Sequence, residues 1–410
     1  MGVPMGILRE VPPTAGFPLY ARDIFSSLKA KNLQGSLEGD FNKYLDIDNA
    51  WVTYSGTTAF YLILETLKEI SPKKTVIIPS FICPLVPLAV KKAGLKVEVC
   101  DINAGDFDFN LAELENICAQ NKDILAIVAV HLGGIPVDLD VIQGVAQKYG
   151  IFLVEDCAQS LGAEYKGKKT GAFGDFSFFS LCRGKGLTIY EGGVLVARKG
   201  EYAPLVANKI KQLIKDDFFS EGLKILELFG YWMIYRPRAF WFAYRLPQIF
   251  WNLQGKKFKA AIEYFSEDFP THNVSRLRRR IGHAGFCHLE NEIDRQRERA
   301  GWYNEAFKAV PGIKILQEPA NTRVTYPYVV ALFADARNRR RFWQKAEPLG
   351  LGVGQIYSLP ITEYDYLKYF INQKECSGAR SFAERHVTFS CSIYLEKRDV
   401  RSILAMVKSL

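Results

Sequence analysis

The chain has 410 residues, of which 48% are hydrophobic and 24% are charged. This balance excludes a disordered or low-complexity chain, and the length predicts two domains. The formal net charge of +9 favours anionic partners such as nucleotide diphosphates or an acidic membrane surface. The one compact basic run, Arg276–Arg280, is typical of a solvated helix face, and no nucleic-acid-binding motif accompanies it, so we expect no nucleic-acid partner.

The eight cysteines show neither a CxxC pair nor a regular spacing. Free thiols in a reducing cytoplasm account for this pattern better than a disulfide framework or a zinc site. Arg9 and Glu10 are not followed by the apolar run of a signal peptide. We therefore expect a cytoplasmic protein without a metal site.

From Trp51 to Arg198, short β-branched runs alternate with helical stretches. The run 124–130 is continuously apolar, as a strand covered on both faces must be. The alternation predicts an α/β fold with a mostly parallel seven-stranded sheet and helices on both faces. The strands are expected at Val52–Ser55, Thr75–Ser80, Lys96–Ile102, Ile124–His131, Phe152–Cys157, Asp175–Leu181 and Gly193–Arg198, with helices including Thr57–Ile70, Pro84–Ala93 and Leu139–Tyr149.

A charge-rich helical pattern at Phe286–Val310 leads into a smaller C-terminal α/β domain. We place the domain boundary after residue 272, which gives a large domain of residues 1–272 and a smaller one of residues 273–410. The smaller domain is expected to have strands at Tyr326–Phe333 and Val387–Ser390 and helices at Ala336–Pro348 and Lys397–Lys408.

An aromatic insert of about residues 216–270 ends the large domain. Residues 229–251 hold ten aromatic side chains, three arginines and no acid. Pro237 and Pro247 break the apolar runs, which are far shorter than the ~20 residues of a spanning helix. Two interpretations stay open: a peripheral contact with a membrane surface, or an aromatic helical pair packed into the core or a dimer interface.

The chemistry is concentrated after the predicted strands, where parallel sheets bind ligands. Lys185 lies between Gly184 and Gly186, which let the backbone bring its amine close to a planar cofactor. A lysine amine can hold pyridoxal phosphate (PLP) as a Schiff base and can move a proton. Asp156 can pair with the ring nitrogen of PLP, and Ser180 can reach its phosphate.

The segment Gly56-Thr57-Thr58 follows a predicted strand and opens a helix. Backbone N–H groups and hydroxyls at a helix start form a phosphate site. Alone this pattern is weak, because many helices begin in the same way. Together with Ser180 and Lys185 it predicts a PLP site.

The segments 55–60 (SGTTAF), 78–81 (IPSF), 154–163 (VEDCAQSLGA) and 191–193 (EGG) occur in the order found in one family. They resemble the signature of the DegT/StrS sugar-nucleotide aminotransferases, which are fold-type-I PLP enzymes. The resemblance implies a homodimer whose sites borrow partner residues, with glutamate as amino donor. It implies that PLP is bound by Gly56, Thr57, Thr58, Asp156, Gln159, Ser180 and Lys185.

The sequence departs from the family around substrate recognition. Cys83 stands where an aromatic side chain often stacks on PLP, and Phe81 is a possible substitute. The family's Asn-x-Arg element, which reaches the partner's phosphate, is one residue too wide here, at Asn273 and Arg276. Its substrate loop keeps Tyr357 and lacks both histidines. His131 matches a family motif, and two interpretations stay open for it: a position near cofactor or substrate, or a satisfied histidine at a strand end.

The sequence as a whole predicts a PLP-dependent aminotransferase that transfers an amino group from glutamate to a keto-sugar carried by a nucleotide, for cell-surface polysaccharide biosynthesis. A second hypothesis is PLP-dependent dehydration of a sugar. Lys185 argues against it, because that branch of the family has histidine there. A third is a non-catalytic, membrane-associated protein of the same fold, and the retained Lys185, Asp156 and Ser180 argue against it.

Overall fold

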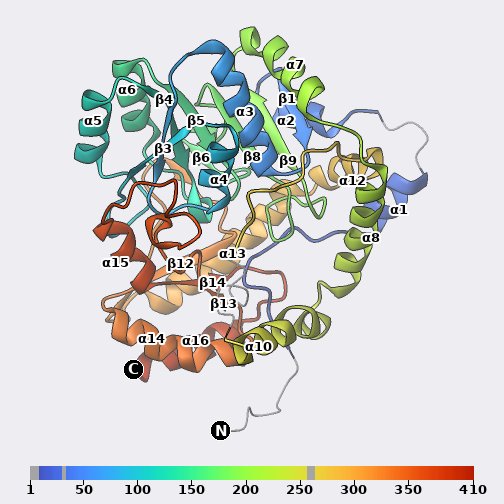
Figure 1. Ribbon diagram of the computed structural model, residues 1–410. Helices are drawn as coiled ribbons and strands as arrows, with labels where there is room; N and C mark the ends of the chain where they lie inside the picture. Colours follow the sequence, from blue (N-terminus) through green and yellow to red (C-terminus); the bar gives the residue numbers. More distant parts are fainter. Residues whose placement is uncertain (1–8, 30–33, 256–263) are drawn as a thin grey trace.

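The computed structural model describes residues 9–29, 34–255 and 264–410. The predicted seven-stranded sheet is confirmed, and each of its strands begins and ends within about two residues of the predicted bounds. Figure 1 shows this sheet in the upper part of the molecule with helices around it. Its strands are β1 (Ala50–Thr53), β2 (Thr75–Pro79), β3 (Lys96–Cys100), β4 (Ile124–Val130), β5 (Phe152–Asp156), β8 (Phe176–Ser180) and β9 (Gly193–Ala197).

The strand order is β1-β9-β8-β5-β4-β2-β3. Strands β3, β2, β4, β5 and β8 pair in parallel, whereas β9 is antiparallel to both of its neighbours. All seven residues of β4 are buried, as its continuous apolar run predicts. The helices around the sheet are α1 (Ala21–Lys29), α2 (Leu37–Leu45), α3 (Gly56–Ile70), α4 (Leu85–Lys92), α5 (Leu111–Gln120), α6 (Leu139–Tyr149) and α7 (Ala203–Leu213).

The C-terminal region forms a smaller, antiparallel four-stranded sheet with its own helices. The predicted helix at 286–310 is found as one helix, Leu289–Phe307, and a separate helix ends just before it at Phe286. The elements are α12 (Arg276–Phe286), α13 (Leu289–Phe307), β10 (Ile313–Ile315), β12 (Tyr328–Phe333), α14 (Ala336–Ala346), β13 (Val353–Gly354), α15 (Ser377–Arg385), β14 (His386–Ser390) and α16 (Lys397–Lys408).

The two regions are joined by a small third sheet. Strand β11 (Thr322–Arg323) pairs with β6 (Glu164–Tyr165), which pairs with β7 (Lys168–Lys169). Helix α12 packs on α1 and α2, so it lies against the N-terminal region. The domain boundary after residue 272 stays a prediction.

The aromatic insert is helical in its described part. It consists of α8 (Phe218–Ile234), α9 (Pro237–Phe240), a π-helical turn (Trp241–Arg245) and α10 (Leu246–Leu253). Figure 1 shows α8 along the outer side of the molecule and α10 at its lower edge. Residues 256–263 of the predicted insert lie outside the described residues. Within the described ranges, no helix is both long and apolar enough to cross a membrane.

The basic run Arg276–Arg280 is not uniformly solvated, and the prediction of a solvated helix face is wrong for Arg278. Arg276 is exposed, but the Arg278 side chain is 0% exposed and pairs with Glu221 of α8. The helical period turns every third or fourth side chain of α12 toward the interior. Charge alone therefore could not show which arginine of the run is buried.

Candidate active site

Lys185 lies on the connection between the antiparallel strands β8 and β9. The connection is closed by backbone hydrogen bonds, from Leu181 N–H to the Gly192 carbonyl at 2.7 Å and from Arg183 N–H to the Tyr190 carbonyl at 2.9 Å. Gly184 has φ +79°, a conformation that side chains disfavour, and an added Cβ would meet Thr14 Oγ1 at 2.8 Å. The glycine before Lys185 is thus required by the shape of the loop.

The start of α3 lies directly against the ends of β8 and β9. A Cβ on Gly56 would meet Ser180 Cβ at 3.3 Å, and a Cβ on Gly193 would overlap the Ser55 carbonyl carbon at 2.3 Å. Only glycine fits where the backbones of residues 55–56 and 193 meet. A side chain at Gly193 would therefore push the segments 55–60 and 191–193 apart. Their contact places Gly56, the first residue of α3, next to Ser180, the last residue of β8.

The hydroxyl of Thr58, one of the predicted phosphate ligands, already has protein partners. Thr58 Oγ1 donates to the Pro270 carbonyl at 2.9 Å and lies 2.9 Å from Ser55 Oγ. Its N–H donates to Ser55 Oγ, which caps the helix. Ser180 Oγ accepts only a long hydrogen bond, 3.4 Å, from Cys182 N–H within the described residues. Ser180 and Thr57 are therefore the more available hydroxyls.

Asp156 ends β5 and is 5% exposed. Burial raises the pKa of its carboxyl to about 6, although the Ala158 N–H, Lys185 and His131 favour the charged form. The Ala158 N–H donates to Oδ1 at 2.9 Å. Among the described residues, the Ala158 N–H is the one hydrogen-bond donor to this carboxylate. A buried carboxylate with so few donors is stabilised in its charged form by a cationic partner.

A cavity of about 360 Å³ opens beside Lys185. Two predicted cofactor residues, Lys185 and Gln159, line it, as do Cys83 and Tyr357. Gln159 Oε1 accepts from Gly133 N–H at 2.9 Å and from the Tyr328 hydroxyl. Gly184 and Gly186, which flank Lys185, line it as well. The remaining lining residues carry no sequence signal that marked them: Thr14, Leu161, Arg183, Phe265, Ile293, Gln296, Thr325, Pro327, Tyr328, Gln355 and Ile356.

The lining of the cavity separates the two candidates for a ring-stacking position. Cys83 lines it, whereas Phe81 is 1% exposed and packs against Tyr357, Phe382 and His386. Phe81 therefore packs in the core behind Tyr357 and does not line the cavity, and the identity of the stacking residue stays a prediction. Phe265, near the end of the predicted insert, contributes an aromatic ring to the cavity.

His131 does not line this cavity. It is 1% exposed, its Nδ1 accepts from Val137 N–H at 3.2 Å, and its Nε2 lies 3.3 Å from Glu155 Oε2. Burial alone would raise the pKa of Glu155, but His131 and the backbone N–H groups of Gly171 and Gly174 lower it. Both imidazole nitrogens thus have partners, which favours the satisfied-histidine interpretation over a substrate contact.

His131, Glu155 and Cys157 also place metal-ligand atoms within 4.8 Å of one another. The Glu155 carboxylate is occupied by hydrogen bonds from Gly171, Phe173 and Gly174 N–H. This cluster is therefore explained as a structural network of the strand ends. The site is empty of any cation.

Asn273 and Arg276 lie outside the cavity lining. Asn273 Nδ2 donates to Asp216 Oδ1 at 2.7 Å, and Arg276 is exposed at the start of α12. Neither the hydrogen bond of Asn273 nor the exposure of Arg276 tests their predicted role at a partner's phosphate. That role stays a prediction.

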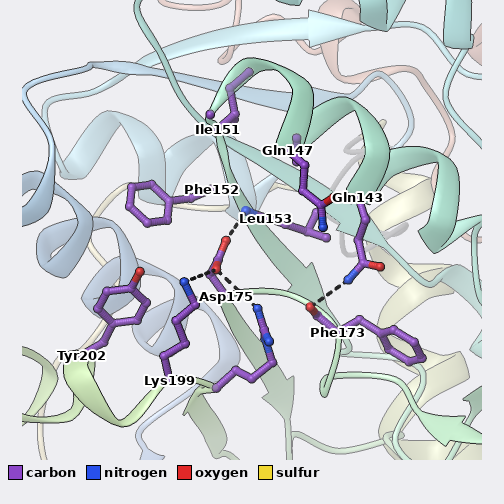
Figure 2. Close-up of a pocket in the computed structure, with 12 residues that line it drawn as sticks. Gln143, Gln147, Ile151, Phe152, Leu153, Phe173, Asp175, Lys199 and Tyr202 are labelled. Atoms are coloured by element: carbon purple, nitrogen blue, oxygen red, sulfur yellow. Dashed lines mark hydrogen bonds and ion pairs between the residues drawn. The ribbon is translucent and has the colours of Figure 1, made fainter.

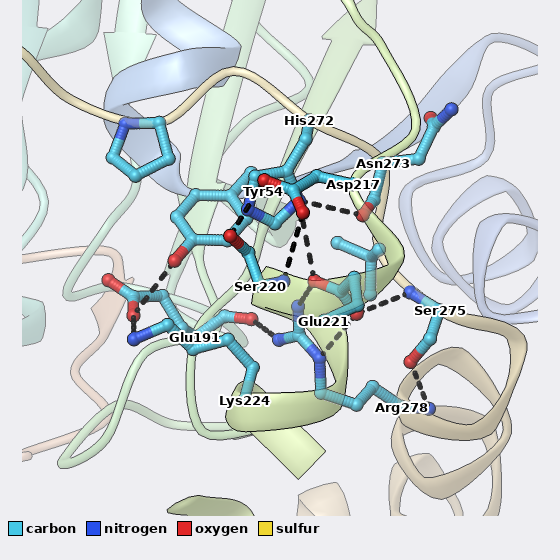
Figure 3. A network of polar contacts seen from close by, with 12 residues as sticks. Tyr54, Glu191, Asp217, Ser220, Glu221, Lys224, His272, Asn273, Ser275 and Arg278 are labelled. Carbon is cyan, nitrogen blue, oxygen red and sulfur yellow. Dashed lines mark hydrogen bonds and ion pairs between the residues drawn. The ribbon is translucent and has the colours of Figure 1, made fainter.

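A buried polar network connects the aromatic insert with the loop that carries Lys185 (Figure 3). Arg278 Nε donates to Glu221 Oε2 at 3.0 Å, and its Nη1 donates to the Glu191 carbonyl. Lys224 pairs with the Glu191 carboxylate at 3.0 Å. Helix α8 thus holds the residue that precedes the Gly192-Gly193 pair.

A second cavity, of about 290 Å³, lies at the opposite edge of the large sheet (Figure 2). It is lined by residues from the amino ends of β5 and β8, among them Leu153 and Asp175. Asp175 accepts from Leu153 N–H at 3.0 Å and lies 3.6 Å from Arg198. These polar groups pair with one another. The cavity lies at the amino ends of β5 and β8, whereas parallel sheets bind their ligands at the carboxyl ends of the strands.

Comparisons with known proteins identify the family of the chain. The sequence profile of the DegT/DnrJ/EryC1/StrS aminotransferase family matches residues 27–217 and 254–408. The chain therefore belongs to this family of aminotransferases, which confirms the resemblance seen in its motifs. The profile passes over residues 218–253, which are α8 to α10.

Individual relatives share about a quarter of their residues with this chain. A UDP-4-amino-4,6-dideoxy-N-acetyl-beta-L-altrosamine transaminase of Campylobacter jejuni is 26% identical over 368 residues, 88% of this chain and 85% of its own. A GDP-perosamine synthase of Caulobacter vibrioides is 27% identical over 80% of this chain and 72% of its own. The solved structure of the Helicobacter pylori aminotransferase PseC has a TM-score of 0.76 at 18% identity, with 98% of this chain and 99% of that chain covered. It confirms the fold.

Proposed function

We propose that this aminotransferase uses PLP to move an amino group from glutamate to a keto-sugar carried by a nucleotide diphosphate, for cell-surface polysaccharide biosynthesis. The observation that carries the proposal is the position of Lys185, which opens into the same cavity as Gln159 and lies within electrostatic reach of the buried Asp156. The named relatives act on UDP- and GDP-linked sugars, which supports the substrate class.

The residues fit PLP in their chemistry. Asp156 is a buried carboxylate in need of a cationic partner, which a protonated pyridine nitrogen would supply. The first turn of α3, with Gly56, Thr57 and Ser180 close together, offers N–H groups and hydroxyls to a phosphate. When bound, PLP supplies an electron-withdrawing ring that stabilises negative charge at the substrate carbon.

The protein's own residues would hold the cofactor, transfer the proton and orient the ring. Lys185 Nζ would hold the cofactor covalently, and as a free amine it would take a proton from the substrate carbon and return one. The Asp156 carboxylate would keep the ring nitrogen protonated, and Gln159 would orient the ring from the cavity wall. Tyr357, half-buried beside Cys83, would close the cavity against water.

A homodimer belongs to the same proposal. Asn273 and Arg276 lie outside the cavity of their own chain and are free of any role in its lining. In a dimer they would supply polar contacts to the partner's phosphate site, as the family resemblance implies.

The experiment is an acceptor screen. Purified protein is incubated with PLP, glutamate and UDP-, GDP- or TDP-linked keto-sugars, and 2-oxoglutarate is measured together with the mass of the sugar nucleotide. We expect stoichiometric 2-oxoglutarate and an aminated product with at least one acceptor. Cofactor binding without amination of any acceptor would overturn the substrate class, and loss of water from the sugar would favour the dehydratase hypothesis.

A further inference from the structure

The helical part of the aromatic insert, residues 218–253, exposes an unusual share of the apolar surface. Of the 18 large apolar side chains that are exposed among the described residues, 11 lie in this segment. Single exposed apolar residues are normal on a soluble protein, but a contiguous group marks an interaction surface. The family profile does not match this segment, so the surface is an addition to the shared fold.

On α8 the exposed apolar side chains form one stripe. Phe219, Leu223, Leu226 and Met233 are spaced by four, three and seven residues, which is the helical period. Leu226 is 68% exposed, whereas Leu228, two residues on, is fully buried. The helix is therefore apolar on both its inner and its outer side.

The π-helical turn and α10 repeat this arrangement. Phe242, Leu246, Ile249 and Leu253 are spaced by four, three and four residues, and all are exposed. Figure 1 shows α10 at an edge of the molecule, continuing from the lower end of α8. We call these two exposed stripes the outer face of the insert.

The inner side of the insert is fixed to the body of the protein by polar contacts. Arg245 is buried and donates to Glu10 Oε2 at 2.9 Å, and the Tyr394 hydroxyl donates to the Tyr235 carbonyl at 2.8 Å. These contacts, with the Glu221–Arg278 pair, hold the inner side in place. The outer stripes cannot turn inward without breaking them.

The turn between α8 and α10 carries two positive charges, while the exposed Glu227 of α8 is paired with Lys224 at 2.7 Å. Arg236 and Arg238, on the turn between α8 and α10, are both exposed. Neither forms an ion pair with a carboxylate in the part of the chain that the structure describes. Residues 229–251 contain no acid at all.

We propose that the outer face of the insert docks on an anionic lipid surface. The apolar stripes would enter the boundary between headgroups and acyl chains, and Arg236 and Arg238 would contact lipid phosphates. The charges favour this occupant over a second copy of the chain. A twofold interface sets the same patch against itself, which would oppose arginines to arginines without a compensating carboxylate.

The test is co-flotation of the full-length, PLP-loaded protein with vesicles of phosphatidylcholine, with or without about 30% phosphatidylglycerol. We expect binding to the anionic vesicles and little to the neutral ones. Arg236→Gln with Arg238→Gln should weaken binding about 30-fold, because each arginine near such a surface contributes about a factor of five. Leu226→Ser with Leu246→Ser should weaken it at least about tenfold.

Two controls separate this proposal from unfolding and from a role in catalysis. Arg236→Lys with Arg238→Lys should retain most of the binding, and Tyr369→Ser, which removes a 92% exposed aromatic side chain elsewhere, should retain all of it. The visible spectrum of the bound cofactor should be unchanged in every variant. Failure to bind anionic vesicles would overturn the proposal. Dissociation of a dimer by Leu226→Ser with Leu246→Ser would overturn it too, and would assign the face to a second copy.

Discussion

The body of the protein and its aromatic insert place their apolar side chains in opposite ways. In β4 and α3 of the body, apolar side chains are buried and polar ones lie at the carboxyl edge of the sheet. In α8 and α10 of the insert, apolar side chains face outward along two stripes. The body therefore carries the candidate active site on a fully packed core, whereas the insert exposes an apolar surface to solvent.

The contact between the two regions has an apolar and a polar part, and Leu228 of α8 packs with Ile24 and Ile281 in the apolar part. Arg278 joins Glu221 of the insert to the backbone at Glu191, next to the glycine that touches Gly56. The insert is thus attached at the edge of the cofactor site without lining it through α8 or α10. The following predictions test this division, from the largest expected effect to the smallest.

Lys185→Ala should remove the chemistry of the body and leave the insert unaffected. We expect turnover to fall by at least about a thousandfold, because among the described residues Lys185 is the only lysine that lines the cavity. Turnover is measured by 2-oxoglutarate release and docking by vesicle co-flotation. Lys166→Ala, which removes an exposed lysine paired with Asp140, is the matched control. Substantial turnover in Lys185→Ala would contradict the assignment.

Arg278→Met should damage both regions, because it leaves Glu221 buried without its partner. We expect a loss of about 3–5 kcal/mol in the free energy of unfolding, measured by urea titration. The double variant Glu221→Gln with Arg278→Met should recover part of this loss. If the single variant is as stable as the wild type, the buried pair does not connect the regions.

Asp156→Asn should change the pH dependence of the cofactor-free protein. Burial raises the pKa of this carboxyl to about 6, so between about pH 4 and pH 6 the folded state keeps a proton that the unfolded chain has lost. Stability contributed by this group therefore falls as pH rises through that window, by on the order of 3 kcal/mol.

Asparagine cannot ionise, so the variant should gain stability relative to the wild type between about pH 4.5 and pH 7. Urea titrations at the two pH values measure the difference in the free energy of unfolding between the variant and the wild type. Added PLP should reduce this difference, because a protonated ring nitrogen would compensate the charge of Asp156. A difference between the two proteins that does not depend on pH would rule out the raised pKa.

Leu226→Ser and Leu228→Ser form a matched pair on α8. Leu226 is 68% exposed and Leu228 is 0% exposed. We expect the first to change the free energy of unfolding by less than about 0.5 kcal/mol and the second to lower it by about 3 kcal/mol. Thermal or urea unfolding measures both. Equal effects would show that the outer face is packed in solution.

The sequence predicted the body well, because periodicity and glycine positions are local signals. Helices α6 and α16 have the predicted bounds, and the seven sheet strands were all found. The contact of Gly56 and Gly193 was implied only by the family motifs, since the two residues are far apart in the chain. Lys185 and Gln159 line one cavity because they follow neighbouring strands of the large sheet, whereas Tyr357 reaches it from the C-terminal region.

What the sequence could not show were the partners of individual side chains. From the sequence, Phe81 and Cys83 are both candidates for the position that stacks on the cofactor ring. Only the packing against Phe382 and His386 shows that Phe81 belongs to the core. Arg278 lies in a run of arginines that looks solvated. Phe265 and Gln355 reach the cavity from distant segments without a motif to mark them.

The central claim is tested most directly by the visible absorption spectrum of the purified protein, recorded with PLP before and after addition of glutamate. The structure predicts a visible band from the cofactor bound to Lys185, which glutamate removes and a keto acid restores. Lys185→Ala should lack that band. Absence of a lysine-dependent band in the wild-type protein, even after PLP is added, would contradict the account.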